Sequence, residues 1–120
     1  MKPEPHISGS AQNDIAHALE WSFENFGAAA EARYAALIAA AIAHAAQDPN
    51  AIGFVARAEL PGAVLSWHLS QSVMHSARGR VRKPRHVLIC RWVDEQFQVA
   101  RLLHEVQDPT LNFDCATDWE

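Results

Sequence analysis

Apolar residues in the first third of the chain recur at helical spacing and predict an α-helix. They follow one another at intervals of four, four and three, which places them on one helical face. These residues are Ile15, Leu19, Phe23 and Phe26. Ser10 stands where an N-cap belongs, and Asp14 suits the positive end of the helix dipole. Gly27 is a natural residue to close the helix.

A second helix is predicted from about residue 28 to residue 47. The segment is rich in alanine, which has the highest helix propensity, and Asp48-Pro49 ends it. Its apolar face consists of Tyr34, Leu37, Ile38, Ala41, Ile42 and Ala45. Because alanine side chains permit close approach, we expect the two helices to form an antiparallel hairpin.

The rest of the chain favours strands. Residues 6–8 are a possible short strand, and residues 50–62 read as a connector. Apolar and polar residues then alternate over residues 64–69, which is the period of a half-buried strand. A long polar, basic loop is expected over residues 70–84.

Two further strands follow that loop. Residues 86–93 are nearly all apolar, so this strand is expected at the centre of the sheet. A tight turn at residues 94–96 makes the strand over residues 97–104 antiparallel to it. Asp108-Pro109 stops that strand, and the acidic remainder is left open as a short helix or a loose tail.

This order of elements predicts an α+β fold. An N-terminal strand and a helical hairpin would pack on a small antiparallel sheet and give a two-layer domain. The 120 residues suit one domain, with its core at about residues 5–110 and an acidic tail over residues 111–120.

Composition narrows the class of protein. Apolar residues make up 49% of the chain and charged residues 20%, which is ordinary for a folded protein. No apolar run approaches the roughly 20 residues of a membrane span, and the N-terminus has no signal-peptide core, so a cytoplasmic protein is expected. Cys90 and Cys115 are expected as reduced thiols, with a disulfide as the alternative.

Charge is segregated along the chain. Residues 1–50 carry a net charge of −4, residues 51–91 carry +6 and residues 92–120 carry −6. The basic third could attract an anionic surface, or the acidic tail could neutralise it. The candidate binding cations of its last part are Arg78, Arg80, Arg82, Lys83, Arg85 and Arg91. No Phe or Tyr lies between Arg78 and Arg91, so this segment by itself lacks the aromatic groups of an RNA-binding surface.

Catalytic and metal signatures are weak. No pair among the seven histidines has the spacing of a recognised zinc site, so no metal is expected. The serines around His68 form no nucleophile elbow, and no carboxylate pair stands out for acid–base work. His104 is either a strand-end histidine that hydrogen-bonds a loop or a catalytic imidazole.

Several stretches together resemble the ParE branch of the RelE/ParE toxins. Residues 10–27 resemble the first helix of that family, with Ala11 and Asp14 early and Phe26-Gly27 at its end. Residues 28–49 are similar to its second helix. The segments "VLSWHLSQS", "PRHVLICRW" and "VARLLHEVQDP" resemble three of its strands. The third segment carries an ending typical of the family, formed by Arg101, Leu103, His104 and Asp108.

The resemblance implies a RelE-like fold and a toxin of a type II toxin–antitoxin system, of the kind also described as plasmid stabilisation proteins. Such a toxin inhibits DNA gyrase by binding, without being an enzyme or using a cofactor, and a ParD-like antitoxin neutralises it. The residues then expected to bind partners are the six cations named above, Arg101 and His104. We expect an acidic, amphipathic antitoxin segment to lie along the hairpin and the sheet edge.

Two alternatives stay open. One is a RelE-type ribosome-dependent mRNA endoribonuclease, although everything after Arg101 lacks Lys, Arg and Tyr. The other is a degenerate toxin that only binds an antitoxin. The chain also departs from the ParE pattern, with a long basic loop, Cys90 where many relatives have Tyr, and residues 105–107 less basic than in many active toxins.

Overall fold

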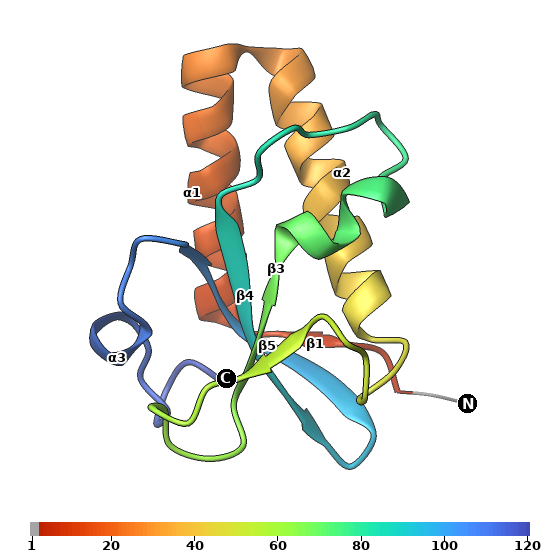
Figure 1. Ribbon diagram of the computed structural model, residues 1–120. Helices are drawn as coiled ribbons and strands as arrows, with labels where there is room; N and C mark the ends of the chain where they lie inside the picture. The colour runs from red at the N-terminus through yellow and green to blue at the C-terminus, as the bar shows by residue number, and fades with distance from the viewer. Residues whose placement is uncertain (1–2) are drawn as a thin grey trace.

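The computed structural model describes residues 3–120 and shows the predicted helical hairpin standing on a sheet (Figure 1). Helix α1 spans Gly9–Phe26 and helix α2 spans Ala28–Ala45. Gly27 joins them with a φ of 89°, a value in the region that favours glycine. Its N–H donates to the Phe23 carbonyl over 2.9 Å and closes α1 as expected.

The start of α1 differs from the prediction. Ser8, not Ser10, is the N-cap, and its Oγ accepts the Ala11 N–H over 3.0 Å. Ser8 Oγ also donates to the Ala100 carbonyl, which fixes the start of α1 against the sheet. Asp14 lies beyond the first turn, so the helix dipole is not what places it there. Sequence could not separate two serines that both precede the apolar stripe.

Five strands form one sheet in the order β1-β5-β4-β3-β2. Their bounds are β1 His6–Ile7, β2 Phe54–Ala56, β3 Leu65–His68, β4 His86–Val93 and β5 Gln96–His104. The sheet is mixed, which corrects the antiparallel prediction, because β1 pairs parallel with β5. Strand β2 lies in the segment that was expected to be a connector. It was missed because it is a three-residue edge strand with two exposed residues.

The centre of the sheet follows the prediction for β4 and adds a bulge. Strand β4 lies between β3 and β5, antiparallel to both. Asp94 and Glu95, both with positive φ, make the two-residue turn into β5. Cys90 pairs with Val99 and Ile89 with Arg101, so Ala100 is a bulge residue without an opposite partner. Because of the bulge, each residue of β5 after Ala100 points to the opposite face from the one it would have in an unbroken register.

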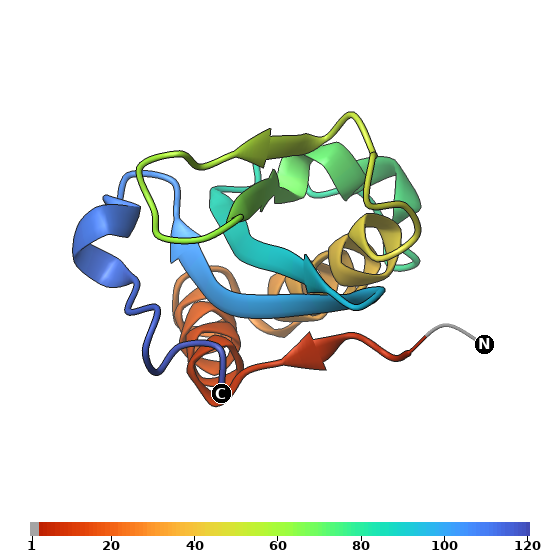
Figure 2. The ribbon, with the colours of Figure 1, turned by 90° about the horizontal axis from the view of Figure 1, so that it is seen from below.

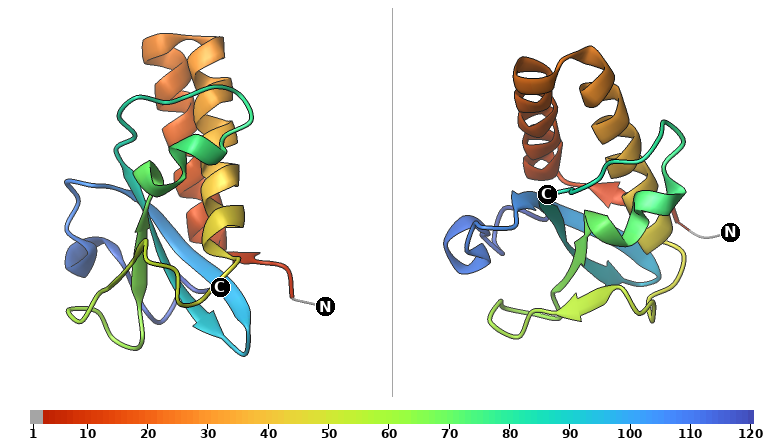
Figure 3. Two further views of the ribbon diagram at one scale, coloured as in Figure 1. Left: turned by 45° about the vertical axis from the view of Figure 1, so that its right-hand side comes forward. Right: turned by 45° about the horizontal axis from the view of Figure 1, so that its top comes forward.

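The expected basic loop is part helix. A 3₁₀ helix, η1, covers Leu69–His75 and leaves residues 76–85 as the loop. Ser72 is fully buried and lies 2.9 Å from His44 Nδ1. The Trp67 indole N–H donates to the same hydroxyl over 3.0 Å. These bonds hold η1 against α2, and Figure 3 shows the two elements side by side.

The hairpin covers one face of the sheet with only part of its length. The larger core joins Leu37, Ile38 and Ala41 of α2 to Trp67 and Leu88 of the sheet, together with further apolar residues. The far end of the hairpin projects beyond the sheet (Figure 1). Phe23 and Phe26, on the predicted apolar face of α1, are therefore 51% and 68% exposed.

The C-terminal segment covers part of the opposite face. Helix α3 spans Pro109–Asn112, and the residues after it run to the start of α1 (Figure 2). Phe113 and Trp119 pack on a second core of buried residues from the sheet and the β2–β3 connection. That core consists of Leu60, Val64, Ile89, Ala100 and Leu103. The acidic remainder is thus folded onto the sheet, so the sheet is covered on both sides.

Two observations complete the fold. Within residues 3–120, no helix combines the length and apolar character needed to cross a membrane.

Cys90 is buried and Cys115 exposed, and both are free thiols, as expected. Burial raises the pKa of the Cys90 thiol, so this group stays protonated and behaves as a small apolar side chain.

The second core makes a prediction about stability. Because Phe113 and Trp119 are partly buried, replacing either with Ala should lower the free energy of unfolding by about 1–3 kcal/mol in urea denaturation. Leu111→Ala is the matched control, since this side chain is 82% exposed, and its effect should stay within about 0.5 kcal/mol. Equal effects of all three changes would show that the C-terminal segment does not stabilise the domain.

Candidate functional site

One ion pair joins α1 to β5. Asp14 Oδ2 accepts from Arg101 Nε over 2.6 Å, and Asp14 Oδ1 accepts from Arg101 Nη2 over 3.0 Å. The Leu102 backbone N–H donates to the same carboxylate. The side chains are 22% exposed for Arg101 and 15% for Asp14, so solvent screens this two-point pair only partly. The hydrogen bond to Asp14, assisted by its charge, raises the pKa of Arg101.

Arg101 also binds the C-terminal segment. Its Nη1 donates to the Asn112 carbonyl and lies 3.4 Å from Asp118 Oδ2. Burial opposes ionisation of Asp118, but hydrogen bonds from the Asp114 N–H, Ser10 and Arg101 outweigh it and lower its pKa. Arg101 therefore connects β5, α1 and the C-terminal segment, and all three nitrogens of its guanidinium bind groups within the protein.

A tyrosine and two histidines meet beside this ion pair. Tyr34 of α2 places its hydroxyl 2.6 Å from His86 Nδ1 and accepts the Arg85 N–H over 3.2 Å. His86 and His104 lie opposite each other on β4 and β5, with ring centroids 5.3 Å apart. Because the bulge at Ala100 shifts the register, it is the bulge that brings these two rings to the same face.

The protonation of this cluster follows from its surroundings. Burial, and then the nearby His104, lower the pKa of His86 to about 4, so its imidazole is neutral near pH 7. The Tyr34 oxygen already accepts the Arg85 N–H, so its hydroxyl hydrogen can donate to His86 Nδ1. Burial also raises the pKa of Tyr34, which keeps the hydroxyl protonated. Val106 N–H donates to His104 Nδ1, which is the loop contact expected of a strand-end histidine.

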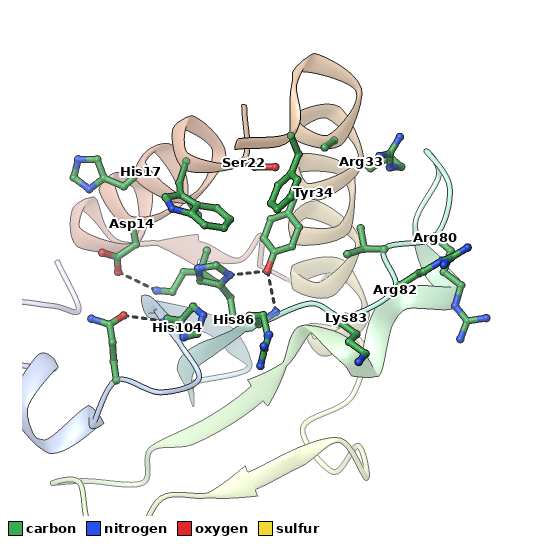
Figure 4. Close-up of a pocket in the computed structure, with 18 residues that line it drawn as sticks. Asp14, His17, Ser22, Arg33, Tyr34, Arg80, Arg82, Lys83, His86 and His104 are labelled. Carbon is green, nitrogen blue, oxygen red and sulfur yellow. Dashed lines mark hydrogen bonds between the residues drawn. The ribbon is translucent and has the colours of Figure 1, made fainter. Parts of the chain in front are cut away.

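These residues line a cavity of about 890 Å³ between the hairpin, the basic loop and the ends of β4 and β5. Figure 4 shows Arg80, Arg82 and Lys83 at one end and Asp14 at the other. Helix α1 adds Trp21 and Phe26, and α2 adds Arg33 and Tyr34. The other lining residues are His17, Ala18, Ser22, Ala30, Val81, Arg85, His86, Leu102, His104 and Gln107.

The structure brings together five of the eight residues that sequence selected as partner-binding. Arg80, Arg82, Lys83, Arg85 and His104 line the cavity.

The other three residues lie elsewhere. Arg78 is exposed in the loop outside the cavity lining. Arg91 stacks over the Trp119 ring at 4.0 Å and donates to Gln98, so it belongs to the contact with the C-terminal segment. Arg101 is engaged by Asp14 and is not part of the cavity lining.

Arg85 is the one cavity-lining cation with an acidic partner in the part of the chain that the structure describes. Its Nη1 lies 2.9 Å from Glu105 Oε2, while Glu105 Oε1 lies 2.9 Å from His68 Nε2. The hydrogen bond with His68, and then the one from Arg85, lower the pKa of Glu105. This ion pair fixes the Arg85 side chain at the cavity lining and weakens its attraction for an external anion.

Sequence reasoning missed the aromatic side of the cavity. Trp21 lies off the apolar face of α1, so the helical periodicity does not select it. In the structure its side chain is 58% exposed and is not part of the core. Its ring packs edge to face with Phe26, with centroids 5.6 Å apart. A tryptophan on the polar face of an otherwise amphipathic helix was the signal available. Over residues 3–120, no three or more His, Cys, Asp or Glu side chains are arranged to hold a metal ion.

Comparison with known proteins assigns no family. The chain matches no model of a protein family, and its sequence matches no curated protein. The function therefore has to be argued from the site itself.

The ion pair predicts a large effect of one change. Arg101→Met should lower the free energy of unfolding by about 2–4 kcal/mol in urea denaturation, because Asp14 and Asp118 then lose their partner. In a double-mutant cycle with Asp14→Asn, we expect a coupling of at least about 1 kcal/mol. Arg78→Met, at an exposed position, is the control. Additive effects at positions 14 and 101 would contradict the coupling.

His86 predicts a pH dependence. Its pKa is about 4 in the folded chain against 6.5 for a free histidine, so the unfolded chain takes up a proton first as the pH falls. The free energy of unfolding should therefore decrease between pH 6.5 and pH 4. His86→Gln should show a smaller decrease in urea denaturation across this range. His17→Gln controls for the loss of an exposed histidine. Parallel curves for His86→Gln and the unmodified chain would refute the assignment.

Proposed function

We propose that this chain is the toxin of a type II toxin–antitoxin system and resembles ParE. It acts in the cytoplasm by binding DNA gyrase and is held inactive by a ParD-like antitoxin. The proposal is one of binding, so it assigns no catalytic residue.

One observation carries the proposal. Side chains from the segments that resemble the ParE family lie up to 90 positions apart in the sequence, from Asp14 to His104, yet several of them meet in one site. Asp14 binds Arg101, and Tyr34 is hydrogen-bonded to His86, which faces His104. Polar side chains from four elements that converge in a cavity, one of them with a strongly shifted pKa, support a functional site. The element order also agrees with the fold that the resemblance implies.

The antitoxin contact follows from charge and apolar exposure. Arg80, Arg82 and Lys83 are exposed and line the cavity, and the exposed ring of Phe26 lines the same cavity. An acidic segment with apolar side chains would satisfy both features at once. Such a segment would lie along the hairpin and the basic loop, where it would cover the cavity.

A gyrase supercoiling assay tests the proposal. The purified protein should inhibit ATP-dependent supercoiling or accumulate cleaved DNA, and Arg82→Glu/Lys83→Glu should reduce the effect by roughly tenfold or more if the basic loop makes the contact. Folding of the variant is checked by circular dichroism. No inhibition at a high molar excess of the unmodified protein would refute gyrase as the target.

A RelE-type endoribonuclease is the second candidate, because the cavity places two imidazoles, a tyrosine and several cations together. A neutral His86 could accept a proton, and the cations of the loop could stabilise charge on a phosphate. Primer extension on translated mRNA would distinguish the two functions. New cuts that appear with the unmodified protein and disappear with His86→Gln and His104→Gln would favour the nuclease.

A further inference from the structure

The cavity has an aromatic side that points to a planar ligand. Trp21 and Phe26 are 58% and 68% exposed, although burying such rings is usually favourable. In their edge-to-face packing the edge of one ring meets a face of the other, and both residues line the cavity. A planar heteroaromatic ring can stack on such a face, and stacking of a base on an aromatic side chain contributes about 1–3 kcal/mol.

The cavity also has an excess of positive charge. Its lining holds five Arg and Lys side chains and one carboxylate, and that carboxylate is Asp14, which Arg101 already neutralises. Arg85 is paired with Glu105. The other four cations make no ion pair with any residue from 3 to 120 and are Arg33, Arg80, Arg82 and Lys83. Four unpaired cations in one lining repel one another, and a bound anion relieves this repulsion. Four positive charges therefore suit a polyvalent anion.

Two polar groups between these two sides, Tyr34 and His86, are uncharged. Tyr34 keeps its proton, and His86 is neutral near pH 7. With Nδ1 of His86 and of His104 both accepting hydrogen bonds, each ring has Nε2–H as its remaining donor. Ser22 and Gln107 add further donors and acceptors to the lining. Groups of this kind suit sugar hydroxyls and the edges of a base.

Size and overall charge decide between a small and a large anion. A volume of about 890 Å³ lies within the range of small-molecule sites, roughly 300–1,000 Å³. The whole chain has a formal charge of −4, and the segments on either side of the basic residues 51–91 carry −4 and −6. A long nucleic acid would meet that acidic surface beyond the cavity, whereas a small ligand would not.

We propose that this cavity binds a nucleoside polyphosphate. The phosphates contact Arg33, Arg80, Arg82 and Lys83, and the base stacks on Trp21, against which Phe26 packs. The ligand is either a free nucleotide or the phosphorylated end of a strand, because both present the same chemistry. The inference does not depend on gyrase being the target of the protein.

Calorimetric titration of the full chain with ATP, GTP and inorganic tripolyphosphate tests the site. Both nucleotides should bind, and more tightly than tripolyphosphate, which cannot stack. Trp21→Ala should weaken nucleotide binding by about tenfold, the size of one stacking contact, and leave tripolyphosphate binding unchanged. Trp21 is more than half exposed, so this variant should fold. Quenching of tryptophan fluorescence by ATP in the unmodified chain gives a second readout.

The charge side has a matched pair of variants. Arg82→Glu should weaken nucleotides and tripolyphosphate alike by about tenfold or more, whereas Arg78→Glu, the same change in the same loop but outside the cavity, should change affinity by less than about threefold. If the two variants lost affinity equally, the anion would be attracted by the overall charge of the loop and not by a specific site, and the proposal would be overturned.

The remaining outcomes separate other ligands. If no nucleotide binding is detected at about 5 mM nucleotide, any affinity is too weak for a specific site, and the proposal is overturned. Binding of an acidic peptide but of no nucleotide would overturn it too. A 5′-phosphorylated oligonucleotide that binds more tightly than ATP would support a strand end as the source of the ligand. Equal binding of the same oligonucleotide with a 5′-hydroxyl would overturn recognition of the phosphate.

Discussion

The pair between Asp14 and Arg101 is the constraint on which the other contacts depend. It is the point where α1, β5 and the C-terminal segment are tied together by charge, since the same guanidinium also reaches the Asn112 carbonyl and Asp118. Partial burial makes the pair strong, and it also makes an unpaired member costly. With α1 fixed at Asp14, its next turns stand over the end of β5, and they supply one wall of the cavity.

The bulge at Ala100 is the second geometric requirement. If the register of Cys90 and Val99 continued without a bulge, Leu103 instead of His104 would lie opposite His86, and the imidazole of His104 would turn to the other face of the sheet. With it, both imidazoles face the hairpin, where Tyr34 reaches His86. The bulge and the ion pair thus act together, because one sets which side chains face α1 and the other sets where α1 lies.

The charge pattern has a different meaning in three dimensions than along the chain. Part of the acidic C-terminal third is used within the fold, where Asp118 meets Arg101 and Glu105 meets Arg85. The cations at the tip of the loop keep no such partner in the region covered by residues 3–120. The C-terminal third therefore neutralises part of the basic segment, and the cations at the tip of the loop keep an uncompensated charge.

The hairpin, the central place of β4 and the antiparallel order of β3, β4 and β5 could be predicted from the sequence, because local propensity and hydrophobic periodicity decide such elements. It also indicated most of the basic residues of the cavity. The parallel pairing of β1, the edge strand β2 and the bulge could not be predicted, since each depends on a partner distant in sequence. The same holds for the aromatic groups that the basic loop lacks. These groups are Trp21 and Phe26 of α1, which line the cavity together with the cations of the loop. The sequence of the loop does not indicate which residues of α1 will lie near it.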